Sequence, residues 1–209
     1  AAVNNSFNEI AVIAPPGSGK TTTLIQFAES ILERNDNVAV YVPLSEWAVQ
    51  AEGFLQSISS RSAFAGFKPE HFMLMAHYGR VTLVLDGWNE LSENAKQRVS
   101  LEIKALRRDY PDVRIILSTR QKEIHIPLSG PIVKIDALSE EQQKEIASFL
   151  RGKEGERLLD HAWRTPGIRD LISVPLYLTA LLSQTPGETL PTTKEEVLRL
   201  FVDNHEQDA

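Results

Sequence analysis

A glycine-rich stretch near the start of the chain, APPGSGKT at residues 14–21, most constrains what this sequence can fold into. It follows an apolar run at residues 10–13 and leads into an amphipathic run from Leu24 to Leu32. A strand, a glycine-rich loop and a helix in this order are the context in which such a loop binds phosphate. Because Pro15 and Pro16 have no N–H to donate, the backbone N–H groups of residues 17–21 must hold the anion at the helix N-terminus.

Side chains in this loop have the chemistry that a nucleotide with its metal requires. Lys20 would reach the β- and γ-phosphates, and the hydroxyl of Thr21 would ligate Mg²⁺. The first position of the usual G-x-x-x-x-G-K-[ST] spacing is Ala14, which is tolerable where the residue ends a strand at negative φ. The predicted nucleotide-binding residues of the loop are Gly17, Ser18, Gly19, Lys20, Thr21 and Thr22.

Apolar runs that alternate with helical patterns predict an α/β fold. The predicted strands are Ile10–Ile13, Val38–Val42, Val81–Asp86, Val113–Ser118 and Ile132–Ile135. Helices are predicted over Trp47–Ser60, Pro69–Tyr78 and Ser92–Asp109, besides the helix that follows the glycine-rich loop. Right-handed crossovers between such elements give a mostly parallel, five-stranded sheet in a three-layer α/β/α arrangement, with its site at the carboxyl ends of the strands.

From about Leu138 onward the strand patterns stop and short helical patterns follow. A capping box of Ser139 and Gln142 opens the first of them. The predicted helices are Ser139–Leu150, Glu154–Trp163, Ile168–Leu171, Pro175–Ser183 and Thr193–His205. We therefore expect a P-loop domain over residues 1–137 and a small helical subdomain over residues 138–192. We also expect the chain to be a piece of a larger protein.

Charged side chains follow two of the predicted strands where those strands end. Asp86, at the tip of a buried strand, can hold Mg²⁺ directly or through water, opposite Thr21. Glu90, one turn further on, is placed to polarise an attacking water. Arg120 follows the fourth strand and can contact the γ-phosphate; the alternative is a surface ion pair with an acid such as Glu123. We predict Lys20, Glu90 and Arg120 as catalytic residues, and Thr21 and Asp86 as metal ligands.

Several blocks of sequence carry a combined signal that is more specific than any one of them. Residues 14–22, DGWNE at 86–90 and STR at 118–120 resemble the Walker A, Walker B and sensor 1 motifs of NACHT-domain NTPases, which belong to the STAND class of signalling P-loop NTPases. The stretch IDALSEE at 135–141 resembles that family's link into its first helical subdomain. VPLYL at 174–178 resembles the proline motif that packs on adenine, which implies that Pro175 is a nucleotide contact.

The resemblance implies a switch that binds ATP or ADP with Mg²⁺, favours ATP over GTP and hydrolyses it slowly. In the full-length protein it implies an N-terminal effector, a C-terminal sensor and a homo-oligomer on activation, as in innate immunity or antiphage defence. It also implies that residues 193–209 begin a truncated winged-helix subdomain, and His205 lies too near the chain end to take that subdomain's phosphate contact. Asn89 departs from the family pattern Asp-Gly-x-Asp-Glu, so the catalytic role falls more heavily on Glu90.

Composition narrows the remaining function classes. A formal net charge of −6 without a lysine or arginine block argues against a dedicated nucleic-acid binder. The chain has 0 cysteines, which agrees with a reducing, cytoplasmic setting, and its longest apolar stretch is too short to span a bilayer. Two alternatives stay open: an AAA+-like mechanical ATPase that acts on DNA or protein, and a nucleotide-bound interaction module that hydrolyses nothing.

Overall fold

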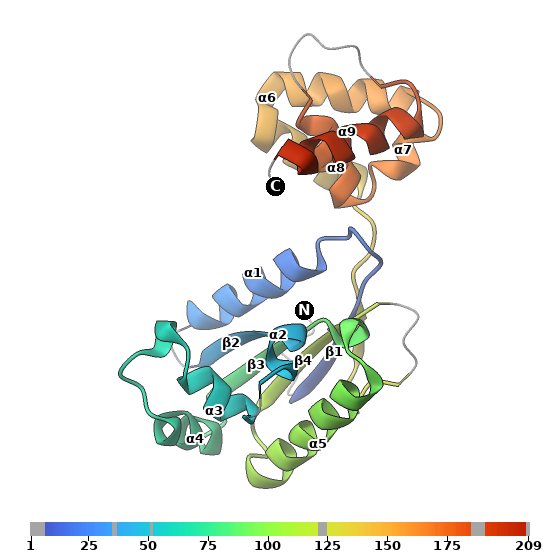
Figure 1. Cartoon of the computed structure of the whole chain (residues 1–209). Helices are drawn as coiled ribbons and strands as arrows, with labels where there is room; N and C mark the ends of the chain where they lie inside the picture. Colours follow the sequence, from blue (N-terminus) through green and yellow to red (C-terminus); the bar gives the residue numbers. More distant parts are fainter. Residues whose placement is uncertain (1–6, 35–36, 51, 121–124, 185–190, 208–209) are drawn as a thin grey trace. The chain divides into compact units, whose positions relative to one another are not determined.

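The computed structural model describes residues 7–34, 37–50, 52–120, 125–184 and 191–207 (Figure 1). The contacts between residues divide the chain into two compact units. One unit comprises residues 1–15 and 20–135, and the other comprises residues 16–19 and 136–209. Most of the glycine-rich loop, residues 16–19, is thus assigned to the second unit. The strand before the loop and the helix after it belong to the first unit.

The first unit is built on a five-stranded parallel sheet. Its strands are β1 (Glu9–Ile13), β2 (Val38–Pro43), β3 (Val81–Asp86), β4 (Arg114–Thr119) and β5 (Ile132–Lys134). Their order across the sheet is β2-β3-β4-β1-β5, and each neighbouring pair is parallel. The prediction of a parallel α/β fold is therefore confirmed. The runs of β-branched and aliphatic residues in β1, β2, β3 and β4 are largely buried on both faces of the sheet, as parallel sheets require, whereas the edge strand β5 is partly exposed.

Helices cover both faces of this sheet, and the side-chain alternation of the strands assigns each residue to one of them. Helix α1 (Lys20–Leu32) packs on one face, against side chains such as Val12, Val84 and Ile116. The helices on the other face are α2 (Leu44–Ala48), α3 (Phe54–Ser59), α4 (Pro69–His77) and α5 (Glu93–Asp109) (Figure 1). Short 3-10 turns, η2 (Ser62–Phe64) and η3 (Trp88–Glu90), complete this layer.

The helix predicted over Trp47–Ser60 is instead two helices, α2 and α3. The backbone N–H of Phe54 at the start of α3 donates a 2.9 Å hydrogen bond to the carboxylate of Glu102 on α5. A Cβ on Gly53 would lie only 2.5 Å from Oε1 of that carboxylate, so any larger residue here would displace the Glu102 side chain. A contact with a residue far away in sequence restarts the helix, and the local pattern could not indicate it.

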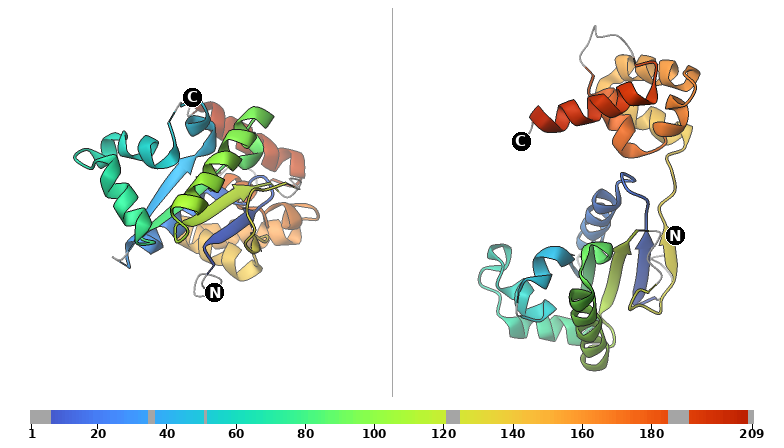
Figure 2. Two further views of the ribbon diagram at one scale, coloured as in Figure 1. Left: turned by 90° about the horizontal axis from the view of Figure 1, so that it is seen from below. Right: turned by 45° about the vertical axis from the view of Figure 1, so that its right-hand side comes forward.

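The second unit is a cluster of helices around its own apolar core (Figure 2). Its helices are α6 (Glu140–Arg164), α7 (Ile168–Leu171), α8 (Pro175–Leu182) and α9 (Lys194–Gln207). Ser139 and Gln142 form the predicted capping box at the start of α6. Gly152 interrupts α6 with non-helical dihedral angles, φ 54° and ψ −135°, at the break predicted between residues 150 and 154.

No helix in the described part of the chain is both long enough and apolar enough to cross a lipid bilayer. The longest, α6, has 25 residues but carries charged side chains along its length.

Candidate phosphate-binding site

Asp86, the last residue of β3, accepts hydrogen bonds from four side chains. Its Oδ1 accepts from Nζ of Lys20 at 2.9 Å and from the hydroxyl of Ser118. Its Oδ2 accepts from the hydroxyl of Thr21 at 2.8 Å and from the hydroxyl of Tyr41 at 2.9 Å. The predicted metal ligands Thr21 and Asp86 and the predicted phosphate-binding Lys20 therefore lie together in one hydrogen-bonded cluster.

The strand order explains how this cluster forms. Strand β4 lies between β1, which leads into the loop, and β3, which ends in Asp86. Ser118 near the end of β4 therefore bridges the gap: its fully buried hydroxyl accepts from Lys20 at 2.9 Å and from the backbone N–H of Gly87 at 3.1 Å. The alternation along each strand turns the side chains of Tyr41, Asp86 and Ser118 toward the face that α1 covers.

The cluster stabilises the ionised form of Asp86. Burial alone would raise the pKa of its carboxyl group. Hydrogen bonds from Ser118, Lys20 and Thr21, together with the charge of Lys20, outweigh burial and hold the pKa below its usual value. The pKa of the Tyr41 hydroxyl is raised by burial and by its bond to Asp86, so this hydroxyl stays a protonated donor.

Glycines shape the loop that precedes the cluster. Gly17 and Gly19 both have a φ of 76°, which favours glycine over any other residue. Within the second unit, the carbonyl of Gly17 accepts a 3.1 Å hydrogen bond from the backbone N–H of Leu176, and a Cβ on Gly17 would lie 3.0 Å from Cβ of Leu176. Ala14, the departure from the usual spacing, extends the strand ladder by donating to the carbonyl of Thr119 at 3.2 Å.

Pro175, the predicted adenine contact, is the first residue of α8. A Cβ added to Gly19 would lie 3.9 Å from Cγ of Pro175, so the proline lies near this end of the glycine-rich loop. A proline at the first helical position is also an ordinary helix start, because its missing N–H would have no partner inside the helix. Its contact with adenine stays a prediction.

Other predicted site residues lie outside the cluster. Thr22 is exposed on α1. The exposed Glu90 folds its carboxylate back over η3, so that Oε2 lies 3.0 Å from where a Cβ on Gly87 would be. Arg120 follows β4 with its side chain exposed. The alternative partner proposed for it, Glu123, lies outside the described residues.

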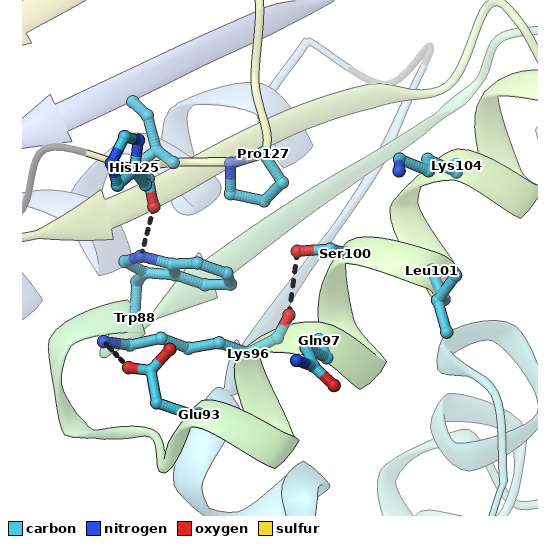
Figure 3. A pocket seen from close by; sticks show the side chains of 10 residues that line it. Trp88, Glu93, Lys96, Gln97, Ser100, Leu101, Lys104, His125 and Pro127 are labelled. Atoms are coloured by element: carbon cyan, nitrogen blue, oxygen red, sulfur yellow. Dashed lines mark hydrogen bonds and ion pairs between the residues drawn. The ribbon is translucent and has the colours of Figure 1, made fainter.

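The acid-containing block 86–90 also borders an open hollow of about 720 Å³ on the face covered by α5 (Figure 3). Trp88 forms one wall and donates from its ring nitrogen to the carbonyl of His125 at 3.1 Å. Lys96, which pairs with Glu93 at 3.2 Å, lies over the Trp88 ring. Because Trp88 belongs to the core under α5 and Asp86 faces α1, this hollow is separate from the cluster.

The sequence predicts no role for Tyr41. In the block at residues 118–120 it assigns the functional role to Arg120, whereas the side chain that contacts Asp86 and Lys20 is Ser118. A signal for Tyr41 does exist, because it is the one polar side chain in the run Val38–Val42. A tyrosine hydroxyl inside a buried strand needs a hydrogen-bond partner; the structure supplies that partner, because the register of β2 against β3 turns Tyr41 to the same face as Asp86.

The residues present fit Mg²⁺. Thr21 and Asp86 offer a hydroxyl and a carboxylate oxygen 2.8 Å apart, and oxygen ligands are those that Mg²⁺ prefers. The hydroxyl of Thr21 can donate its hydrogen to Asp86 and still offer lone pairs to a cation. The lowered pKa of Asp86 keeps its carboxylate ionised, as a metal site needs.

No protein-family model matches this chain, and no curated protein matches it. Solved structures do match its fold. A STAND protein with a tetratricopeptide repeat sensor, PH0952 from Pyrococcus horikoshii, superposes with a TM-score of 0.56 at 14% identity, over 95% of this chain and 31% of that one. Domain III of the replication initiation protein DnaA from Thermotoga maritima gives a TM-score of 0.53 at 18% identity, over 97% of this chain and 87% of that one. AMPPCP-bound DnaA from Aquifex aeolicus gives a TM-score of 0.53 at 18% identity, over 98% of this chain and 62% of that one.

The chain has the α/β fold of the P-loop NTPases. At these identities the similarity concerns the fold alone. The chain spans less than two thirds of the Pyrococcus and Aquifex structures, 31% and 62% of their lengths.

Proposed function

We propose that this chain binds a nucleoside triphosphate together with Mg²⁺, favours ATP over GTP and hydrolyses the nucleotide slowly. The observation that carries the proposal is the cluster of Lys20, Thr21 and Asp86, which lies directly after a loop with two glycines at positive φ. A lysine, a hydroxyl and a strand-end carboxylate at this point are the groups that hold phosphate and metal in P-loop proteins. The fold that the chain shares with P-loop ATPases supports the same conclusion.

Each residue of the proposed site has a role in this function. Backbone N–H groups of residues 17–22 hold the phosphates, and Lys20 exchanges its ion pair with Asp86 for the β- and γ-phosphates. Thr21 and Asp86 hold Mg²⁺, which when bound stabilises negative charge on the phosphate oxygens. Glu90 orients the attacking water, and Arg120 contacts the γ-phosphate.

The finer proposal is a NACHT-type signalling switch within a larger protein. Nucleotide state would bias the arrangement of the P-loop domain, residues 1–137, and the helical subdomain, residues 138–192, with residues 193–209 as the start of a third part. An N-terminal effector, a C-terminal sensor and homo-oligomerisation on activation belong to this proposal. The combined motifs support it, as does the fold shared with a STAND protein.

A second candidate is an AAA+-like ATPase that acts on DNA or protein. The fold shared with DnaA domain III, 87% of which this chain covers, favours it. The net charge of −6 argues against nucleic acid as the substrate. Hydrolysis rates measured with and without single-stranded DNA or an unfolded protein separate the two candidates, because only the second predicts stimulation of several-fold.

The test of the proposed function is nucleotide binding by the parent protein and by two lysine variants. Lys20→Ala should abolish the binding of ATP, because it removes the cation that faces the phosphates. The matched control, Lys104→Ala, removes an exposed lysine from α5 and should bind as the parent does. Heat release and chromatography of any co-purifying nucleotide identify the base. If Lys20→Ala binds ATP as tightly as the parent, the phosphate site is assigned to the wrong residues.

A further inference from the structure

The hydroxyl of Tyr41 is the fourth donor to the carboxylate of Asp86, and no sequence motif includes it. Tyr41 lies in the middle of β2 with a half-buried side chain that packs on the α1 face of the sheet. Its hydroxyl lies 2.9 Å from Oδ2 of Asp86. This is the same oxygen that accepts from Thr21 at 2.8 Å, so Tyr41 and Thr21 together fix one oxygen of the carboxylate.

The two carboxylate oxygens of Asp86 have different partners. Oδ1 is bound by Lys20 and Ser118, whereas Oδ2 is bound by Thr21 and Tyr41. In the proposed function Lys20 leaves Asp86 when phosphate arrives, which removes a charged donor from Oδ1. Tyr41 has no such second task, so it can bind Oδ2 with and without nucleotide.

The backbone around Tyr41 is held from outside the sheet. Strand β2 is an edge strand, and edge strands offer backbone groups without a strand partner. The guanidinium of Arg61, which lies between α3 and η2, donates a 2.7 Å hydrogen bond to the carbonyl of Tyr41. This bond and the packing of the ring keep the hydroxyl at one place relative to Asp86.

We propose that Tyr41 is a positioning residue for the metal site, which holds Oδ2 of Asp86 beside the hydroxyl of Thr21 and so sets how strongly Mg²⁺ promotes nucleotide binding. The inference rests on the proposed function, because it takes Thr21 and Asp86 as the residues that hold Mg²⁺. Tyr41 acts through Asp86 and need not touch the metal or the nucleotide. Partners of this kind, one shell outside the ligands, orient the ligand oxygens.

The experiment compares Tyr41→Phe with Tyr110→Phe, measuring the dissociation constant of ATP with Mg²⁺ and with excess chelator. Both variants lose one hydroxyl, but Tyr110 follows the last residue of α5 and precedes β4, near the amino end of that strand, whereas Asp86 is at the carboxyl end of β3. In Tyr41→Phe the gain in affinity that Mg²⁺ provides should fall roughly 10-fold. Binding without Mg²⁺ should equal that of the parent, and Tyr110→Phe should match the parent in both conditions.

Phenylalanine keeps the ring packing of Tyr41, and Thr21 still donates to Oδ2, so the variant should fold; circular dichroism checks this. A purely structural role would weaken binding equally with and without Mg²⁺, which would overturn the inference. So would an unchanged gain from Mg²⁺ in Tyr41→Phe. If the parent binds no nucleotide at all, the proposed function fails instead, and that outcome is distinct from the other two.

A second set of variants tests whether Tyr41 acts through Asp86. Asp86→Asn should lose most of the gain from Mg²⁺, because the carboxylate is replaced by a neutral amide. If Tyr41 only positions this carboxylate, adding Tyr41→Phe to Asp86→Asn should change the gain no further. An additional 10-fold loss in the double variant would mean that Tyr41 acts independently of Asp86, which contradicts the proposal.

Discussion

Nζ of Lys20 lies 2.9 Å from Oδ1 of Asp86, so the lysine predicted to bind phosphate is already paired with an acid. Both side chains are largely buried, with 15% and 9% of their side-chain surfaces exposed. Phosphate binding would therefore exchange one anionic partner of Lys20 for another, and the carboxylate would lose its counter-charge unless a cation replaces it. Under the proposed function, this coupling predicts that nucleotide and Mg²⁺ bind together.

The pH dependence of stability should report on this pair. The pKa of Asp86 is lowered in the folded protein, so its contribution to stability is present above the unfolded value of about 3.9 and is lost as pH falls through the folded value. The difference in unfolding free energy between the parent and Asp86→Asn should be constant above about pH 5 and should shrink below about pH 4. Chemical unfolding of both proteins above about pH 5 and below about pH 4 measures this difference in free energy.

Asp109 supplies the control for this experiment. Arg108 also lowers the pKa of Asp109, but this pair is fully exposed, so solvent screens it. Asp109→Asn should therefore differ little from the parent at any pH. A difference for Asp86→Asn that grows on acidification would contradict the assigned direction of the pKa shift.

Ser118 should contribute to stability through its hydroxyl. That hydroxyl donates to Asp86 and accepts from Lys20 and from the backbone N–H of Gly87. Ser118→Ala leaves this buried N–H without its partner, so we expect a loss of about 1–3 kcal/mol in unfolding free energy. Ser100→Ala, which removes a hydroxyl bonded to the backbone within α5, should cost less than about 0.5 kcal/mol. Equal losses in the two variants would show that the bridge at Ser118 stabilises little.

Much of this fold could be predicted from the sequence, because strands buried on both faces leave continuous apolar runs. These runs predict both ends of the strand Val81–Asp86 correctly. For the other strands, each predicted end lies within one residue of the observed end. The acid that ends this strand and the glycine-rich loop before α1 were predicted to meet, and Asp86 does contact Lys20 and Thr21. The strand prediction depends only on consecutive residues. The predicted contact depends only on the carboxyl ends of parallel strands lying on the same side of the sheet.

What escaped prediction depends on contacts between residues far apart in sequence. The break between α2 and α3 comes from Glu102, which follows Phe54 by 48 positions. The bond from Tyr41 to Asp86 needs the register of β2 against β3, in which Tyr41 pairs with Val84. Neither register nor such contacts can be read from the local pattern of a single strand.

Glu90→Gln should separate binding from hydrolysis. The change keeps the size of an exposed side chain, so stability should move by less than about 0.5 kcal/mol and ATP binding should persist. Turnover should fall by a factor on the order of 10²–10⁴, because an amide cannot take a proton from water. Phosphate release under saturating ATP measures this, with Glu93→Gln, an exposed neighbour, as the control. Unchanged turnover would assign the base role to another residue.

Gly87 offers a way to move Glu90 without changing it. Gly87 has a φ of 93° and Gly66 a φ of 95°, so alanine at either position should cost a similar backbone strain of roughly 1–2 kcal/mol. A Cβ on Gly87 would lie 3.0 Å from Oε2 of Glu90 and would push the flexible carboxylate aside, whereas a Cβ on Gly66 would have no atom within 4 Å. Thermal unfolding and phosphate release are measured for both variants.

The two alanine variants should therefore lose similar stability, because the strain is of the same kind and the end of a glutamate side chain yields easily. Only Gly87→Ala should also lose turnover, because its Cβ displaces the carboxylate proposed to orient water. Glu90→Gln tests the chemistry of the carboxylate, and the comparison of the two alanine variants tests its position. If Gly87→Ala and Gly66→Ala hydrolyse ATP at the same rate, the position that Glu90 takes over η3 has no part in hydrolysis.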